Sequence, residues 1–78
     1  AALRAAKPAA GKFVEVTGNL VNVRAAPNTS GRILGVVRKG ERLAYQGQSR
    51  AVGDTAWYLI VYLNQNGWIS GKYGRLTR

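Results

Sequence analysis

The sequence contains no cysteine and no histidine. Without cysteine, no disulfide can brace a chain of 78 residues, a length at which a single hydrophobic core is only marginally stable. Without histidine, the chain lacks the commonest metal ligand and the commonest general base at neutral pH. We therefore expect one domain whose stability comes from closing a β-sheet on itself or from a partner.

Long apolar runs are also missing. No run approaches the roughly 20 residues that cross a bilayer, so no transmembrane segment is expected. The first residues lack the apolar core of a signal peptide. We therefore expect any export signal to have been removed or to lie outside this sequence.

Acidic residues are scarce. Glu15, Glu41 and Asp54 are the 3 acids set against 12 lysines and arginines, which gives a net charge of +9. The acids lie far apart in the sequence and no nucleophile has a base beside it, so we expect no catalytic site, no metal site and no cofactor. The positive charge should attract anionic polymers such as nucleic acid, an anionic membrane or an anionic cell wall.

Short alternations of apolar and polar residues, separated by glycine-containing turns, fill the sequence from Phe13 onward. Strands are expected at 14–17, 20–24, 33–37, 42–46, 57–63 and 75–77, with a further short run after a turn at 64–67. Residues 26–31 and 47–54 are expected as loops, and Lys39-Gly40 as a tight reversal. Since no 3.6-residue period occurs, the pattern predicts an all-β fold, a small barrel of about five or six short strands with no long helix.

The first residues differ from the rest in composition. Residues 1–12 are rich in alanine and basic, and Pro8 interrupts them. The residues before that proline are too few to form a helix unaided in water. We expect a basic linker over 1–12 and one domain over 13–78.

The stretch from Trp57 to Ser70 predicts a β-hairpin around which the rest of the chain wraps. Residues 57–63 form an uninterrupted apolar run of the types that favour strands. Turn-forming residues follow at 64–67, where Gly67 permits a positive φ.

Side chains along the apolar run point alternately to two faces. One face carries Tyr58, Ile60 and Tyr62; the other carries Trp57, Leu59, Val61 and Leu63. We expect the first face to fill the core, with Ile60 at its centre. The second would leave an exposed apolar stripe, in which Leu59, Val61 and Leu63 are a candidate protein interface.

Several short motifs follow one another along residues 14–76. They are Asn22-Val23-Arg24 with Pro27 beyond them, the Lys39-Gly40 turn, Trp57 at the start of a strand, Gly67-Trp68-Ile69, and Tyr73 near the end. In this order and spacing they resemble the bacterial SH3 family, small barrels appended to cell-wall hydrolases and other exported bacterial proteins. The chain departs from the family at Ala26, where relatives usually have glycine, and at Leu59 and Val61, where they often have polar residues.

The resemblance implies an SH3-like β-barrel that acts as a non-catalytic targeting module outside the cell or in the envelope of a bacterium. Relatives bind peptidoglycan, often its peptide stems or cross-bridges, and hold an attached enzyme against the wall. The implied partner is therefore the peptide or glycan of peptidoglycan. The positive charge makes anionic wall polymers a further candidate partner. Since small barrels serve many functions, the surface has to support this assignment.

The candidate ligand-binding residues are aromatic or form hydrogen bonds. They are Trp57, Trp68, Tyr45, Tyr62, Arg24 and Asn22. Half-exposed aromatic rings are platforms for sugars and peptides, but both tryptophans could equally be core or lid residues. Tyr58 and Tyr73 are expected in the core, Tyr73 inside a tight turn at 71–74. For Arg24 a structural role is favoured, bridging loop carbonyls beside Pro27.

A cluster of cations flanks two of the expected turns. It consists of Arg32, Arg38, Lys39 and Arg42, the densest positive segment of the expected domain. We take these residues as a candidate contact for anionic polymers. The alternative is a solvated rim, which charge runs usually form.

Three classes of function remain open. The first is a non-catalytic wall-binding module with a shallow aromatic groove. The second is nucleic-acid binding, which the charge and the aromatic residues allow but the family resemblance disfavours. The third is a structural module that associates with its own copies or with a neighbouring domain through the apolar stripe.

Overall fold

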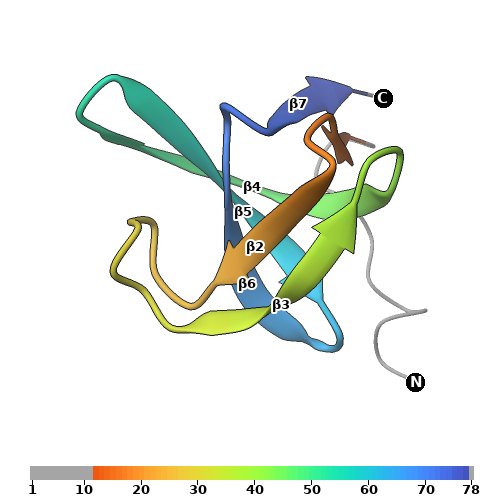
Figure 1. Cartoon of the computed structure of the whole chain (residues 1–78). Helices are drawn as coiled ribbons and strands as arrows, with labels where there is room; N and C mark the ends of the chain where they lie inside the picture. The colour runs from red at the N-terminus through yellow and green to blue at the C-terminus, as the bar shows by residue number, and fades with distance from the viewer. Residues whose placement is uncertain (1–11, 78) are drawn as a thin grey trace.

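The computed structural model describes residues 12–77, which form seven strands and no helix (Figure 1). The strands are β1 (Phe13–Val16), β2 (Leu20–Arg24), β3 (Ile33–Arg38), β4 (Arg42–Val52), β5 (Thr55–Tyr62), β6 (Gln65–Ser70) and β7 (Gly74–Thr77). The all-β prediction is confirmed, but the strand number of five or six is wrong. The predicted linker over 1–12 lies outside the described residues except for Lys12, as does Arg78 of the predicted domain.

All strands pair antiparallel in one sheet, in the order β3-β2-β6-β5-β4-β1-β7. The long strand β4 pairs with β1 through its first residues and with β5 from Tyr45 onward, so it carries the chain from one half of the sheet to the other. Within residues 12–77 no ladder joins the edge strands β3 and β7, so the sheet is not closed. Two backbone bonds of 2.8 Å, Gly40 N to Val16 O and Val16 N to Glu41 O, hold the β3–β4 turn against the end of β1.

The β4–β5 hairpin replaces the polar loop that was expected over 47–54. Strand β4 continues through most of this segment to Val52, and the chain turns at Gly53-Asp54. A register shift between Tyr45 and Ser49, with Gly47 at φ 86°, lets the strand change direction. The hairpin projects from the body of the molecule (Figure 1), and β4 is exposed on both faces from Gly47 to Val52, so this segment gives no alternating apolar signal.

The β5–β6 hairpin is present, but its turn lies earlier than predicted. The turn is Leu63-Asn64, both with positive φ (45° and 70°), and Tyr62 pairs with Gln65. Gly67 lies inside β6 and not in the turn. A Cβ at Gly67 would come within 2.6 Å of Cγ1 of Val23, so glycine is needed there for close packing and not for a turn.

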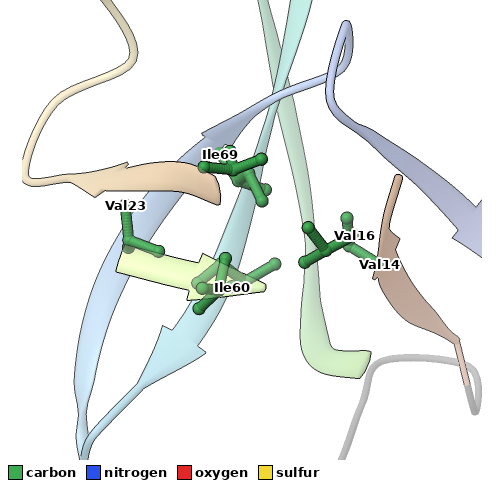
Figure 2. Packing of buried hydrophobic residues seen from close by; sticks show 7 residues of the cluster. Val14, Val16, Val23, Ile60 and Ile69 are labelled. Carbon is green, nitrogen blue, oxygen red and sulfur yellow. The ribbon is translucent and has the colours of Figure 1, made fainter. Parts of the chain in front are cut away.

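The core consists of small branched side chains from five of the strands (Figure 2). The buried cluster is Val14, Val16, Val21, Val23, Val37, Ile60 and Ile69. Tyr58 and Tyr62 pack against this cluster and Ile60 is 0% exposed, so the predicted facing of β5 is confirmed. Within β1 and β2 the buried residues alternate with more exposed ones, as a sheet with one covered face requires.

Replacing Ile60 with alanine should lower the free energy of unfolding by about 2 to 5 kcal/mol, because it opens a cavity in a fully buried site. Urea denaturation followed by circular dichroism measures the loss. Leu20→Ala is the control: this side chain is 71% exposed, and its removal should change stability by about 0.5 kcal/mol or less. Equal midpoints for the two variants would contradict the assigned facing of β5.

Substitutions in the Leu63-Asn64 turn should raise the stability of the domain. Left-handed backbone costs an ordinary residue roughly 1 to 2 kcal/mol, and Asn-Gly is the preferred pair for a two-residue hairpin turn of this kind. The double substitution Leu63→Asn with Asn64→Gly should therefore raise the free energy of unfolding by about 1 kcal/mol in thermal denaturation. Leu63→Ala removes the same exposed side chain but keeps the backbone strain, so it should not raise the free energy of unfolding by a comparable amount. An equal increase in both variants would mean that removal of the leucine side chain, and not relief of backbone strain, is responsible.

Candidate ligand groove

The outer face of the sheet carries the side chains that point away from the core. Trp68 of β6 lies opposite Leu59 of β5 on one side and Arg24 of β2 on the other, while Ser70 lies opposite Trp57. Since residues directly opposite one another point to the same face, these five side chains share the outer face. A groove of about 640 Å³ opens at the Trp57–Ser70 end of it.

Segments far apart in the sequence line this groove. The lining residues are Leu20, Val21, Asn22, Arg24, Asn28, Thr29, Val52, Thr55, Trp57, Ser70, Lys72 and Tyr73. They come from β2, from the loop between β2 and β3, from the β4–β5 hairpin, and from the end of β6 with the turn after it. In Figure 1 the hairpin and the β2–β3 loop project on the same side of the molecule. Both contribute lining residues, so they are the two arms of the groove.

The β2–β3 loop is held in shape by its own hydrogen bonds. Nη1 of Arg24 donates to the carbonyl of Gly31 at 2.9 Å, and Ala25 N donates to Arg32 O at 2.8 Å across the base of the loop. The amide of Ser30 donates to Oδ1 of Asn28 at 3.0 Å. The expected structural role of Arg24, bridging a loop carbonyl beside Pro27, is therefore confirmed, and the residue also lines the groove.

The groove is positively charged. Arg24 and Lys72 are both among its lining residues, and none of the described residues that line it is acidic. Glu15 forms an ion pair with Arg75 at 3.3 Å, and Glu41 accepts from the backbone N–H of Arg38. These two carboxylates are therefore engaged elsewhere. Asp54 lies in the exposed tip of the β4–β5 hairpin and does not line the groove.

Three of the predicted ligand-binding residues meet in the groove: Trp57, Arg24 and Asn22. Trp57 was expected on an exposed stripe, but it is only 5% exposed, because Ser70 and the β4–β5 hairpin flank it on both sides. Little of this residue is therefore open to a ligand in the groove. Asn22 is exposed, next to Arg24 on the outer face of β2.

The other predicted aromatic residues lie elsewhere. Tyr45 packs edge-to-face against Tyr58, with ring centroids 5.9 Å apart, and both pack on the core. The ring of Tyr62 covers Gly35, where a Cβ would collide with its hydroxyl. Trp68 is half-buried on the outer face beside Leu59. None of Tyr45, Tyr62 and Trp68 lines the groove.

Tyr73 contradicts the prediction that its turn buries it. The side chain is 51% exposed and lines the groove. Its carbonyl accepts from Thr17 N at 2.8 Å and from Gly18 N at 3.3 Å, so the backbone is anchored while the ring lies over Gly18. A tyrosine between glycines in a turn carries no local signal of which way its ring points.

The predicted cationic cluster is divided between the two ends of β3. Arg38, Lys39 and Arg42 lie around the β3–β4 turn, and the guanidinium of Arg42 stacks on the ring of Phe13 at 4.4 Å. Arg32 lies before β3, about 20 Å away by the rise of an extended strand. All four side chains are exposed.

The predicted apolar stripe is not continuous. Leu59 and Val61 are half-buried, and Trp57 is buried. Leu63 is exposed, but it belongs to the β5–β6 turn and leaves the strand alternation. The expectation of a contiguous exposed stripe is therefore wrong, and the interface assigned to Leu59, Val61 and Leu63 stays a prediction.

Most of the groove residues were not anticipated from the sequence. They are Leu20, Asn28, Thr29, Val52, Thr55, Ser70 and Lys72, together with Tyr73. Across the described part of the chain, no group of three or more potential metal-ligating side chains occurs. No helix there is long and apolar enough to cross a membrane.

Comparison with known families supports the resemblance drawn from the motifs. The model of the bacterial SH3 domain matches residues 18–75. This range includes five complete strands, β2 to β6, the start of β7, and every residue that lines the groove. Comparison with curated proteins and with solved structures finds no match.

Replacing Arg24 with glutamine should loosen the β2–β3 loop, because the bond from Nη1 to Gly31 O is lost. We expect a decrease of about 1 kcal/mol in the free energy of unfolding, measured by urea denaturation. Arg32→Gln is the matched control, since it removes an equal charge beside the same loop from an exposed site and should change stability by about 0.5 kcal/mol or less. Equal losses in both variants would mean that net charge, and not the loop bond, is responsible.

Proposed function

Because this chain belongs to the bacterial SH3 domain family, we propose that it is a non-catalytic cell-wall binding module that holds peptidoglycan in the groove described above. Domains of this family are commonly cell-wall binding modules. The proposed ligand is the peptide or glycan part of peptidoglycan. The proposed location is outside the cell or in the envelope of a bacterium, with residues 1–12 as a linker ahead of the domain over 13–78.

The composition of the groove carries this proposal. Peptide and glycan chains are rich in amide and hydroxyl groups, which need both donors and acceptors from the protein. Asn22, Asn28 and Thr29 supply such groups along one side, and Thr55 supplies another opposite them. Tyr73 offers an exposed aromatic face against which a sugar ring or an aliphatic side chain can pack.

The charge of the surface supports a second, less specific contact with anionic wall polymers. Arg38, Lys39 and Arg42 gather at the β3–β4 turn, outside the groove. Exposed charges of this kind act over about 8 Å at physiological salt and raise the rate of encounter more than the final affinity. We assign these three cations to the attraction of the domain to the wall. We assign the groove to the recognition of the ligand.

The alternative functions have weaker support. Nucleic-acid binding on a small barrel uses exposed aromatic rings for base stacking, whereas Tyr45, Tyr58 and Tyr62 pack against the core here. Self-association through the outer face of β5 would rest on Leu59 and Val61, which are already half-buried. The groove, by contrast, offers exposed hydrogen-bonding groups on Asn22 and Thr29 beside the exposed ring of Tyr73.

The isolated domain should sediment with purified bacterial cell wall at physiological salt and should not hydrolyse it. Tyr73→Ala should weaken this binding about tenfold, equivalent to roughly 1.4 kcal/mol, because the exposed ring of the groove is lost. Leu63→Ala removes a side chain that is also more than half exposed but lies outside the groove, and this variant should bind as the parent does.

Enrichment no greater than that of an unrelated protein of equal charge would overturn the proposed function. Binding that disappears between low and physiological salt would place the whole effect in the surface charge. Equal weakening by Tyr73→Ala and Leu63→Ala would remove the groove from the binding site.

A further inference from the structure

We propose that the groove binds its ligand by a free carboxylate group, which Arg24, Lys72 and Ser70 hold. This inference rests on the proposed function, since it names the chemical group by which the wall component is recognised. It follows from the excess of positive charge and hydrogen-bond donors in the groove, since the lining residues that the structure describes include no acid.

The guanidinium of Arg24 has donors to spare. A guanidinium carries five N–H donors in a planar fork, and one of them, on Nη1, is used by the carbonyl of Gly31. Among residues 12–77 no other acceptor lies within hydrogen-bonding distance of this side chain. The edge formed by Nε and Nη2 is therefore left for a bidentate contact with a planar group that has two oxygens.

Ser70 provides a second donor, at the base of the groove. Its side chain lines the groove although the residue is only 6% exposed. Its Oγ accepts the backbone N–H of Lys72 at 3.2 Å, which leaves the hydroxyl proton free to be donated. Asn22, two residues before Arg24 on the same face of β2, lines the same groove.

The charge of the groove selects an anion over a neutral group. Lys72 adds a second cation beside Ser70, and the described lining residues include no acid. A neutral acceptor replaces the hydrogen bonds that water makes to Arg24 and Lys72 but brings no negative charge. A carboxylate replaces these bonds and also supplies a counter-charge, and it can bond to the planar fork of Arg24 with both of its oxygens.

The bond from Arg24 to Gly31 also prepares the site in advance. It fixes the guanidinium in one orientation before the ligand arrives, so less side-chain freedom is lost on binding. Trp57 and Leu20 lie beside the donors and provide an apolar surface. The preferred ligand is thus a peptide end in which a small aliphatic residue carries the free carboxylate.

Isothermal titration calorimetry with the whole chain tests this proposal, with two synthetic wall stem tetrapeptides that differ only at the C-terminus. One peptide ends in a free carboxylate and the other in a carboxamide. The parent should bind the acid at least about tenfold more tightly than the amide. Lys72→Gln and Ser70→Ala should each reduce this ratio several-fold, while Arg32→Gln, which removes an equal charge outside the groove, should leave it unchanged. Circular dichroism establishes that each variant is folded.

Equal affinity for the two peptides would overturn the carboxylate proposal and leave wall binding intact. Failure of both peptides to bind, while whole wall is still sedimented, would overturn it as well, since the wall would then be held through another group. If inorganic phosphate displaces the acid peptide far better than acetate does, the groove is a phosphate site and the proposal is wrong. Failure of the sedimentation experiment is the separate result that removes the proposed function itself.

Discussion

The close approach of β2 to β6 at Gly67 determines both the core and the groove. A side chain at position 67 would collide with Val23, so glycine allows Val23 to join Ile60 and Ile69 in the buried cluster. Because the faces of a strand alternate, burying Val23 directs Asn22 and Arg24 to the outer face. The direction of the groove-lining side chains Asn22 and Arg24 therefore follows from the close packing of Val23 on the inner face of β2. With no disulfide to hold the strands together, this packing is the main source of stability.

The core and the groove are built mostly from different parts of the chain, although Val21 belongs to both. The core residues lie within strands, and their side chains are small and branched. The groove residues lie mostly at strand ends, in the β2–β3 loop and in the β4–β5 hairpin. Substitution of groove residues such as Thr29 or Lys72 therefore leaves the packing untouched, which allows one scaffold to carry different binding surfaces.

Sequence reasoning succeeded where one face of a strand is buried. The alternation of Val14 with Val16, and of Val21 with Val23, places β1 and β2 correctly, and Ile60 is at the centre of the core as expected. It failed for the β4–β5 hairpin, because both faces of that hairpin meet solvent and its polar residues resemble those of a loop. The β5–β6 turn was misplaced because Leu63 adopts a positive φ that its residue type does not favour.

The groove was harder to predict than the fold. Arg24, Asn22 and Trp57 could be named because they belong to motifs with a recognisable order. Ser70, Lys72 and Tyr73 could not, since their role depends on which distant segments the sheet brings beside them. A turn such as 71–74 fixes the backbone direction, but the direction of the Tyr73 ring is decided by its contact with Gly18, more than 50 positions earlier in the sequence.

The β4–β5 hairpin has a kinetic consequence. Its tip contributes no residue to the buried cluster, so the amide hydrogens there are protected only by local pairing, and they would exchange with solvent through small openings that leave the core intact. Val52 and Thr55 form one side of the groove on this tip. The residence time of a bound ligand would then be set by the opening rate of one arm, on a timescale separate from that of global unfolding.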